Sequence, residues 1–289
     1  MAKRVVILGG TGKMGRWFIT FLKNKGFDVV IYSRFPEKAS RVAEELKVGY
    51  ISSIEAVKTA DIVIVSTSLG STAEMVRQVS KKMRSNSILF DVASVKGQVI
   101  ESLNEAKSYG IRTISVHPMF GPGATSLKNK HVLVIPVGVD PEPLNEILHL
   151  FKDAEVHVLG SWEEHDKLVA LTLLLPHFLN LIFGKILSKK DIRDLINLSG
   201  TTFALQLLVT ETVYSEDPDL YYEIQTQNIY FREILDLLLE SIKELAQDVI
   251  TKDRVSFVKN FNNVRSSLQK DPNFTKAYSL FYKVYEAIS

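Results

Sequence analysis

The sequence predicts a chain of two parts, a doubly wound α/β domain over residues 1–160 and an all-helical domain over residues 161–289. In the first part, short runs rich in Val and Ile alternate with helical stretches, which is typical of a largely parallel sheet. From Glu163 onward the strand signals fade, and apolar residues recur at i, i+3 and i+4, as in residues 229–250 and 255–268; this spacing indicates helices. At 289 residues and 46% apolar, the chain is long enough to split into two domains.

Six apolar runs mark the expected strands of the α/β domain. The first, Arg-Val-Val-Ile-Leu at residues 4–8, precedes a glycine-rich turn. A run that is apolar throughout suits a parallel strand that is buried on both faces. The later strands are expected at residues 28–32, 62–65, 88–90, 113–116 and 132–135.

The turn after the first strand reads Gly-Gly-Thr-Gly-Lys-Met-Gly, and residues 16–22 are expected to form the helix that follows. Gly10, Gly12 and Gly15 therefore occupy the positions of a G-x-G-x-x-G fingerprint between strand and helix. Glycine allows a tight turn, close approach of the backbone to a pyrophosphate and tight packing of helix on strand, while the helix N–H groups face the anion. We therefore predict a Rossmann-type dinucleotide-binding domain. A purely structural glycine turn is the alternative.

The end of the second strand bears on the choice between NAD and NADP. An NAD site normally has Asp or Glu there, about 20 residues beyond the fingerprint, to accept hydrogen bonds from the ribose hydroxyls. Here the strand ends in Ser33 and Arg34, with Lys38 just beyond. A hydroxyl and a guanidinium suit a 2′-phosphate because Arg offers forked donors and a permanent charge. NADP is therefore preferred over NAD, unless both cations are merely solvated surface charges. The predicted cofactor-binding residues are Gly10, Thr11, Gly12, Lys13, Met14, Gly15, Ser33, Arg34, Lys38 and Ser66.

Composition and charge narrow the class of protein. The 35 basic and 33 acidic residues are interspersed and leave a net charge of +2, so no nucleic-acid partner is expected. The chain has no cysteine, and its six histidines show no H-x-x-x-H spacing, so neither a disulfide nor a metal site is expected. The apolar run near the N-terminus is short and enters the glycine turn directly, as a first strand does and a signal peptide does not. We expect a cytoplasmic protein.

One segment, residues 168–187, is long and apolar enough to resemble a membrane span. Pro176, His177, Asn180 and Lys185 interrupt it, and the sequence contains no second segment of this kind. A helix that is apolar all round also suits the centre of a large core or a subunit interface. We expect one of these two and no membrane partner.

Residues 114–127 read ISVHPMFGPGATSL and are the most informative stretch of the chain. They place His117 at the end of an apolar strand, before a loop rich in Pro and Gly. Histidine has an ordinary pKa near neutral pH. A rigid strand that delivers such a group downstream of a nucleotide fingerprint suits base-assisted hydride transfer. A packed core histidine is the alternative.

Five motifs carry a resemblance to a known family. They are Asp-Val-Ala-Ser-Val-Lys at 91–96, Val-His-Pro-Met-Phe-Gly-Pro at 116–122, Glu-His-Asp at 164–166, Pro-His-Phe at 176–178 and Asp-Pro-Asp-Leu-Tyr at 217–221. In order and spacing these motifs resemble the prephenate dehydrogenases of tyrosine biosynthesis. The resemblance implies oxidation of the ring C4 hydroxyl of prephenate by hydride transfer to NAD(P), with decarboxylation and aromatisation to 4-hydroxyphenylpyruvate. It also implies a homodimer formed through the C-terminal helical domain.

The resemblance assigns roles to individual side chains. His117 is implied to be the base that takes the hydroxyl proton. Ser94 is implied to hydrogen-bond that histidine and the nicotinamide region, with a helix N-cap as its alternative role. His177 is implied to face the substrate, and Tyr221 of the last motif is assigned to the substrate site as well.

The other histidines receive no catalytic role from the sequence. His165 is expected to cap or start the first long helix, and Asp166 beside it is expected to stay solvated. The histidines without a motif context are expected at the surface or at strand edges; they are His131, His149 and His157.

One departure from the family pattern concerns the substrate. The family carries an arginine before the Asp-Pro pair to hold the ring carboxylate, but residues 198–212 contain none. Either hydroxyl donors at Thr201, Thr202 and Thr212 take over with a distant cation, or the substrate differs. Glu211 would suit the ammonium group of arogenate. An arogenate dehydrogenase, another NADP-linked oxidoreductase and a non-catalytic NADP-sensing dimer therefore stay as alternatives.

Overall fold

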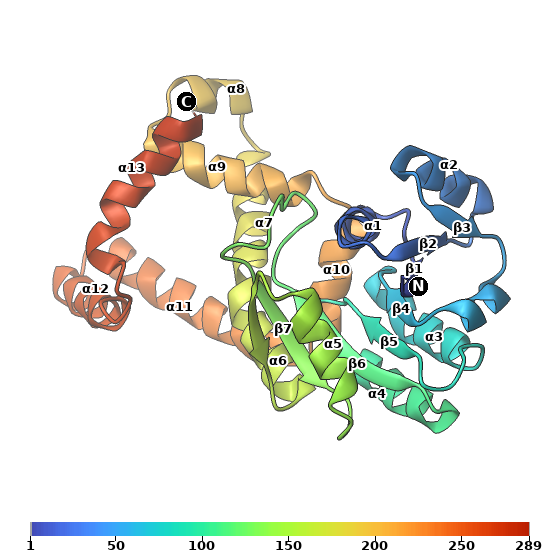
Figure 1. Ribbon diagram of the computed structural model, residues 1–289. Helices are drawn as coiled ribbons and strands as arrows, with labels where there is room; N and C mark the ends of the chain where they lie inside the picture. Colours follow the sequence, from blue (N-terminus) through green and yellow to red (C-terminus); the bar gives the residue numbers. More distant parts are fainter. Residues whose placement is uncertain (1, 289) are drawn as a thin grey trace. The chain divides into compact units, whose positions relative to one another are not determined.

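The computed structural model describes residues 2–288 (Figure 1). The chain forms two compact units. The sheet unit comprises the chain up to Val169 together with Tyr222–Ile229, and the helical unit comprises Ala170–Tyr221 and the chain from Tyr230 onward. The strands all belong to the first unit, and helices make up the described part of the second. The predicted α/β plus all-α class is confirmed.

Eight strands form one sheet in the order β3-β2-β1-β4-β5-β6-β7-β8. They are β1 (Arg4–Leu8), β2 (Asp28–Tyr32), β3 (Gly49–Ile51), β4 (Ile62–Val65), β5 (Ile88–Asp91), β6 (Arg112–Pro118), β7 (His131–Pro136) and β8 (Glu155–Val158). The helices of the sheet unit are α1 (Lys13–Asn24), α2 (Pro36–Leu46), η1 (Ile54–Thr59), α3 (Leu69–Ser80), α4 (Gly97–Ala106), η2 (Lys107–Tyr109), α5 (Glu142–Leu150) and α6 (Trp162–Val169).

Two of these strands, β3 and β8, were not expected from the sequence. Both lie at the edges of the sheet. The first is only three residues long, and the second alternates polar and apolar residues in the sequence Glu-Val-His-Val. Short and polar edge strands protect a sheet from unwanted pairing. Because they are short or polar, these two strands lack the apolar run by which the buried strands are recognised in the sequence.

Every pair of neighbouring strands is parallel except β6 and β7. A parallel return needs a crossover connection, usually a helix. The connection between β6 and β7 contains no helix among the described residues, so β7 returns antiparallel. The N-terminus of β7 therefore lies beside the carboxyl end of β6, where Met119 N donates to His131 O at 2.9 Å.

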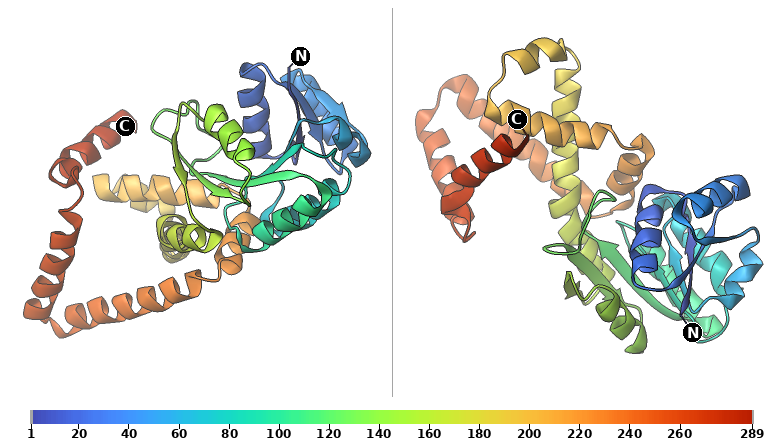
Figure 2. Two further views of the ribbon diagram at one scale, coloured as in Figure 1. Left: turned by 60° about the horizontal axis from the view of Figure 1, so that its bottom comes forward. Right: turned by 45° about the horizontal axis from the view of Figure 1, so that its top comes forward.

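Helices cover both faces of the sheet. On one face, α1, α2 and α5 pack their apolar side chains, among them Phe18, Val42 and Ile147, against alternate residues of the strands. On the other face, α3 and α4 do the same with side chains such as Val76 and Leu103. Figure 2 shows these two helical layers around the sheet. Burial on both faces explains why the central strands are apolar throughout.

The sheet brings several chain segments to one edge. The parallel strands β1, β4, β5 and β6 are neighbours, so their carboxyl ends meet at the same edge. The strand order reverses between β1 and β4, and ligands of doubly wound sheets bind at the carboxyl edge near such a point. Gly9, Ser66, Val92 and Met119 begin the loops that follow these strands.

The helical unit consists of η3 (Ala170–Leu174), a π-helical turn, followed by α7 (Leu175–Leu187), α8 (Ile192–Asn197), α9 (Thr201–Tyr214), α11 (Phe231–Thr251), α12 (Arg254–Leu268), η4 (Phe274–Lys276) and α13 (Ala277–Ile288). Helix α10 (Pro218–Gln227) has residues in both units. The pair α7 and α9 is joined by Asn180, whose Oδ1 accepts from Gln206 Nε2 and Thr210 Oγ1, each at 2.8 Å. These bonds satisfy the side-chain oxygen of Asn180 inside an apolar helix.

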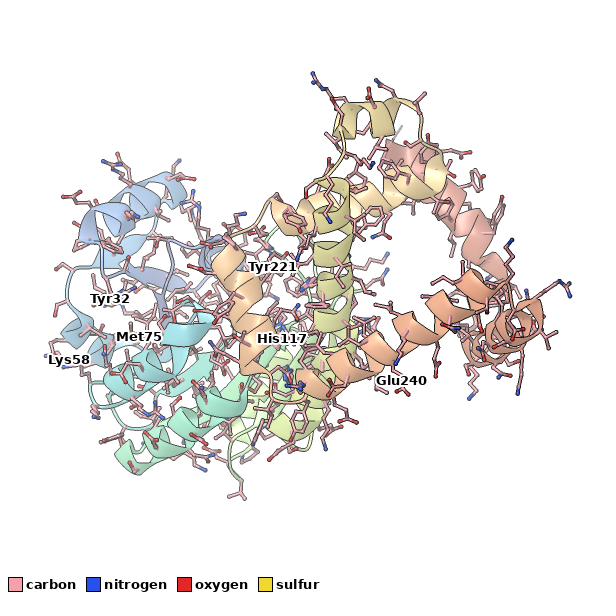
Figure 3. The ribbon with its side chains drawn as sticks, turned by 180° about the vertical axis from the view of Figure 1, so that it is seen from behind. Tyr32, Lys58, Met75, His117, Tyr221 and Glu240 are labelled. Atoms are coloured by element: carbon pink, nitrogen blue, oxygen red, sulfur yellow. The ribbon has the colours of Figure 1, made fainter. Side chains whose placement is uncertain are left out.

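Much of the apolar surface of the helical unit is exposed in the single chain. Helices α11, α12 and α13 follow one another as an open arm of this unit (Figure 2), and Glu240 lies along α11 (Figure 3). Leu237, Leu245 and Val249 of α11 are each more than half exposed. Exposed apolar faces of this extent mark interaction surfaces.

The long apolar segment forms one helical run, Trp162–Leu187, of 26 residues. By length and composition it is able to cross a membrane, with a mean hydropathy of 1.7 over its most apolar window. Only 22% of that window is buried. The expectation that it forms the centre of a large core is therefore wrong for the single chain, and the subunit interface stays as a prediction.

Candidate active site

The glycine turn between β1 and α1 is shaped by close backbone contacts. Gly9 has a left-handed φ of 80°, so the tight turn expected at Gly10 is made one residue earlier. A Cβ atom on Gly10 would lie 2.6 Å from Cγ2 of Ile31, and one on Gly15 would collide with the backbone of Gly9 and Gly10. Gly12, in contrast, is exposed, and the nearest atom to a Cβ there would be Gly9 O at 3.4 Å. The surface beside Gly12 is therefore open to a ligand.

The start of α1 suits an anion. Its N-cap is Gly12, which has no side chain to occupy the first N–H groups, and its first turn contains no acidic residue. Unpaired N–H groups and the helix dipole favour negative charge at such an end. The residues present thus fit the pyrophosphate of a dinucleotide. Of the predicted residues, Thr11 and Met14 are partly buried here, and Lys13 is exposed.

The predicted NADP-selecting residues lie after β2. Arg34 and Lys38 are exposed, and Lys38 Nζ lies 5.0 Å from the ring centre of Phe35. Ser33 is buried, and its Oγ accepts a hydrogen bond from Phe35 N at 3.2 Å. The Ser33 hydroxyl therefore holds its own loop, while the two cations are accessible. Ser66 is partly buried after β4, and its N donates to Leu8 O at 2.8 Å.

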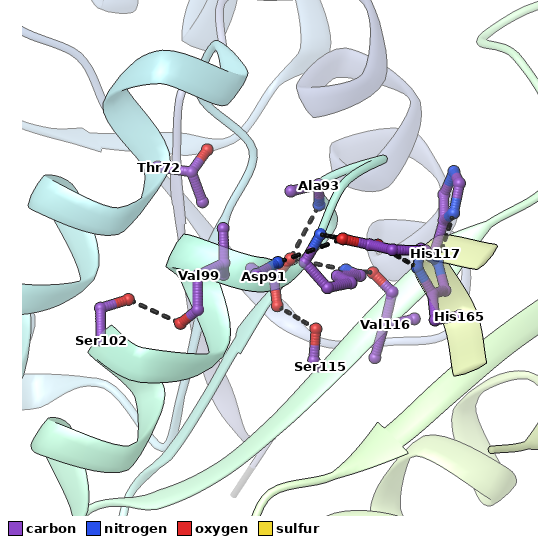
Figure 4. A network of polar contacts seen from close by, with 12 residues as sticks. Thr72, Asp91, Ala93, Val99, Ser102, Ser115, Val116, His117 and His165 are labelled. Carbon is purple, nitrogen blue, oxygen red and sulfur yellow. Dashed lines mark hydrogen bonds and ion pairs between the residues drawn. The ribbon is translucent and has the colours of Figure 1, made fainter. Parts of the chain in front are cut away.

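His117 lies at the end of β6 and is 4% exposed. Its Nδ1 lies 2.9 Å from Nε2 of His165, and Nδ1 of His165 lies 2.8 Å from Oδ1 of Asp166. His165 and Asp166 come from α6, so a helix and a strand together form this line of three residues. Figure 4 shows His117 and His165 in contact. We call this line of three residues the His117 relay.

The start of α4 fixes the outer end of the His117 relay. Asp166 accepts hydrogen bonds from the backbone N of Lys96 at 3.0 Å and of Gly97 at 3.3 Å. The backbone O of Asp166 accepts from Asn228 Nδ2 at 2.8 Å. The carboxylate therefore stabilises the first N–H groups of one helix while it orients the imidazole of another residue.

Burial sets the ionisation of the His117 relay. It lowers the pKa of His117 well below its usual value, and unfavourable electrostatic interactions with His165 and Lys96 lower it further. Burial also lowers the pKa of His165, again with help from Lys96. The pKa of Asp166 is raised to about 6 by burial, against the opposing effect of its backbone hydrogen bonds. Both imidazoles are therefore neutral at pH 7, when the carboxylate is ionised.

This ionisation state fixes the tautomers. An ionised Asp166 only accepts hydrogen bonds, so His165 donates to it through Nδ1 and keeps a lone pair on Nε2. His117 then donates to that lone pair through its own Nδ1. Nε2 of His117 is left with a lone pair, which is the state of a general base.

A buried ion pair stabilises the carboxyl end of β6. Lys96 and Asp91 are both fully buried, with Lys96 Nζ 2.7 Å from Asp91 Oδ2. Lys96 Nζ also donates to Val116 O at 2.8 Å, next to the base. The remaining acceptors of Asp91 take hydrogen bonds from Ser115 Oγ at 2.6 Å and Ala93 N at 2.9 Å (Figure 4). These bonds tie the ends of β5 and β6 together.

Ser94 lies in the loop between β5 and α4 and is partly buried. The N-cap of α4 is Lys96, so the alternative role of Ser94 as a helix N-cap is wrong. The described residues show no hydrogen bond between Ser94 and His117; Nδ1 of the histidine pairs with His165. The predicted role of Ser94 toward the base and the nicotinamide stays a prediction.

The predicted substrate residues lie in the helical unit. His177 of α7 and Tyr221 of α10 are in edge-to-face ring contact, with centroids 5.0 Å apart. Nδ1 of His177 is buried and has no hydrogen-bond partner within the described chain, and burial lowers the pKa of this histidine. A buried polar atom without a partner costs free energy unless a ligand or water satisfies it.

The three threonines lie on α9. Thr201 is partly buried in its first turn, whereas Thr202 and Thr212 are exposed. The Thr212 hydroxyl donates to Val209 O of its own helix at 2.7 Å. Thr212 is therefore a weaker candidate for a carboxylate donor than its sequence position indicates, because its proton already has an acceptor.

One expectation from the sequence needs correction. Asp166, expected to be solvated, is 1% exposed, and His165 beside it in α6 is fully buried. Sequence reasoning missed both as members of the site, as well as the buried Lys96. The Glu-His-Asp and Ala-Ser-Val-Lys motifs contain these residues and could have indicated that they belong to the site. Charged residues at the start of a helix are ordinarily solvated, however, and only the packing of α6 on α4 shows that these are buried.

Known proteins match this chain over most of its length. Residues 18–160 match the prephenate dehydrogenase nucleotide-binding domain, and residues 161–263 match the prephenate dehydrogenase dimerization domain. A probable arogenate/prephenate dehydrogenase of Methanocaldococcus jannaschii is 32% identical over an alignment of 262 residues that covers 88% of this chain. The chain spans 58% of the length of that relative.

Solved structures agree in fold. The prephenate dehydrogenase of Aquifex aeolicus, in complex with hydroxyphenyl propionate and NAD+, has a TM-score of 0.76 at 20% identity, covering 93% of this chain and 98% of its own. Synechocystis arogenate dehydrogenase has a TM-score of 0.71 at 18% identity, covering 92% and 99%. The two domain matches together span residues 18–263, and the chain belongs to the prephenate dehydrogenase family.

Proposed function

We propose that this protein oxidises prephenate, with NADP preferred over NAD, and that arogenate is the alternative substrate. The observation that carries the proposal is the His117 relay, which leaves a neutral imidazole with a free lone pair at the carboxyl edge of a dinucleotide-binding sheet. Membership of the prephenate dehydrogenase family supports the reaction type. The names of the relatives include both prephenate and arogenate, so they do not decide between these substrates.

The relay gives each residue a part in the reaction. His117 accepts the proton of the ring C4 hydroxyl at Nε2 as the C–H bond at C4 breaks. A bound nicotinamide would supply the acceptor for the hydride. The bond from the ring to its carboxylate then breaks and CO2 leaves. The electron pair of that bond makes the ring aromatic, and the C4 oxygen takes up the proton that His117 holds. His165 shares the positive charge that forms on His117, and the Asp166 carboxylate stabilises it. Burial of the three residues keeps water from competing for their hydrogen bonds.

The two predicted domains have different functions in this proposal. We propose that residues 1–160 bind the dinucleotide through the glycine turn, and that residues 161–289 supply substrate contacts and a dimer interface. The unpartnered Nδ1 of His177 beside Tyr221 supports a substrate contact, to which Thr201, Thr202 and Thr212 are proposed to contribute. The exposed apolar side chains of α11 and the dimerization-domain match support a homodimer.

Turnover of the purified protein with prephenate and with arogenate, each with NAD and NADP, tests the function. We expect reduced cofactor and CO2 in equal amounts, with 4-hydroxyphenylpyruvate as the product from prephenate. Faster turnover of arogenate, giving tyrosine, would move the assignment to the alternative substrate. Binding of NADP without turnover of either compound would contradict the proposal and favour a non-catalytic sensor or another oxidoreductase.

Arg34→Asp tests the cofactor preference. We expect NADP to bind about 10- to 150-fold more weakly, because a hydrogen bond to a charged group contributes about 1.5–3 kcal/mol and the new carboxylate repels a 2′-phosphate. NAD binding should be retained. The matched control is Lys58→Asp, which makes the same change of charge on η1, ahead of β4 (Figure 3). Equal or tighter binding of NAD by the unmodified protein would defeat the preference.

Asp166→Asn tests the His117 relay through its pH dependence. Because the pKa of Asp166 is raised to about 6, the unmodified protein should gain kcat/KM as the pH rises through this value and the carboxylate becomes ionised. The Asn variant should lose this rising limb and turn over more slowly at every pH, since an amide does not stabilise the imidazolium. The rate as a function of pH measures both effects.

Glu163→Gln is the matched control for this experiment. The charge of Glu163 raises the pKa of Asp166, as a smaller effect than burial, so its removal should keep the rising limb and move it to lower pH. A purely structural role of Asp166 would lower the rate of the Asn variant and leave the limb in place, which would contradict the relay.

A further inference from the structure

Three metal-ligating side chains gather at the edge of the sheet, outside the residues that the proposed reaction uses. They are His131 of β7 and Glu155 and His157 of β8, and all three are exposed. Nδ1 of His131 lies 3.0 Å from Nε2 of His157 and 3.5 Å from Oε2 of Glu155. The three ligand atoms lie within 4.8 Å of one another.

The register of two parallel strands brings these residues together. His131 stands opposite Glu155, and His157 follows two residues later on β8, opposite Leu133. Because side chains alternate between the faces of a strand, residues at i and i+2 lie on the same face. Glu155 N donates to Lys130 O at 2.8 Å and Met119 N donates to His131 O at 2.9 Å. Two of the three ligands therefore stand on backbone that neighbouring strands hold in place.

The donor set selects the class of ion. Two imidazole nitrogens with one carboxylate oxygen suit zinc, whereas calcium and magnesium prefer oxygen ligands alone. Zinc–ligand bonds of about 2.0–2.1 Å in a tetrahedron place neighbouring ligand atoms roughly 3.3 Å apart. The distances of 3.0 and 3.5 Å around His131 are close to this value. The ligand atoms of Glu155 and His157 lie within 4.8 Å of each other, so rotation of these two side chains would complete the geometry.

We propose that His131, Glu155 and His157 bind a zinc ion, with water as the fourth ligand. The ion reaches the site without opening the fold, because the His131 and Glu155 side chains are 53% and 59% exposed. Bound zinc joins β8, the last strand of the sheet, to β7. The site is distinct from the base: His117 is paired with Leu133, and Leu133 with His157, so two strand spacings, roughly 10 Å, separate the two histidines.

Zinc titration of metal-free protein against a chromophoric chelator tests the site. We expect one ion per chain that the unmodified protein takes from the chelator. Loss of a group that only hydrogen-bonds to a metal ligand typically weakens metal binding by about 10- to 100-fold. His131→Ala and His157→Ala each remove a ligand itself and should weaken zinc binding by at least as much. His149→Ala is the matched control, since His149 is an exposed histidine on α5 outside the cluster, and it should bind as the unmodified protein does.

Two further readouts keep the result independent of folding and of activity. Zinc should raise the melting temperature of the unmodified protein, because a ligand that binds only the folded state stabilises it, and this shift should vanish in His157→Ala while the metal-free melting temperatures stay equal. Cobalt in place of zinc should give the visible absorption of a tetrahedral site. Absence of zinc binding, or unchanged binding by both His→Ala variants, would overturn the proposal.

Discussion

Replacement of His117 by asparagine is expected to lower kcat by about 10²- to 10⁴-fold, the contribution typical of a positioned general base. Asparagine keeps a hydrogen-bonding side chain beside His165 but does not accept a proton near neutral pH. Binding of the dinucleotide should be nearly unchanged, because the glycine turn and Arg34 lie after β1 and β2 and not after β6. Steady-state rates and cofactor titration of the same variant separate these two effects.

His149→Asn is the control for this experiment. It makes the same chemical change at an exposed histidine of α5 and should leave both the rate and the cofactor affinity as they are. If His117→Asn retained most of its kcat, another residue would have to be the base. Normal NADP binding without turnover by the unmodified protein would favour the non-catalytic sensor.

Replacement of Lys96 by methionine is expected to lower the free energy of unfolding by about 3–5 kcal/mol, the usual cost of removing one partner of a buried ion pair. Asp91 would keep its hydrogen bonds from Ser115 and Ala93 but would lose its counter-ion in a fully buried position. Val116 O would also lose its donor. The midpoint of urea unfolding measures the loss.

Arg77→Met provides the matched comparison at the surface. Arg77 makes a two-point contact with Glu105, with Nε–Oε2 at 2.8 Å, but Glu105 is 54% exposed. Exposed pairs contribute about 0–1 kcal/mol, so this variant should unfold almost as the unmodified protein does. The double variant Lys96→Met with Asp91→Asn, which leaves no buried charge, should recover part of the stability lost by Lys96→Met alone. Equal stability of the Lys96 and Arg77 variants would show that the buried ion pair contributes no more to the free energy of unfolding than the exposed one.

The path of the chain was largely predictable because it depends on local patterns. The apolar runs of the buried strands, the glycine turn and the change to helical spacing near residue 163 are all visible in the sequence. The edge strands β3 and β8 were not predictable in this way, since they are short or polar. The place of His117 at the end of β6 follows from the same local pattern.

The composition of the site was less predictable. Asp166 and His165 belong to a motif of the family, but the motif does not show that they are buried, because their burial depends on the packing of α6 against α4 and β6. Lys96 is similar: a lysine just before a helix is ordinarily solvated, yet here it satisfies Asp91 and Val116 O inside the fold. The roles of Ser94, His177 and the α9 threonines stay predictions.

The sequence by itself determined the fold class, the dinucleotide fingerprint, the base candidate at His117 and the family resemblance, because each depends on residues that are neighbours along the chain. Only the tertiary structure decided which groups hydrogen-bond to that base and which proposed zinc ligands lie together at the surface. The His117 relay joins residues 48 positions apart, and His131 and His157 meet although they are 26 positions apart. Helix packing and strand register make these contacts, and neither leaves a spacing that can be found in the sequence.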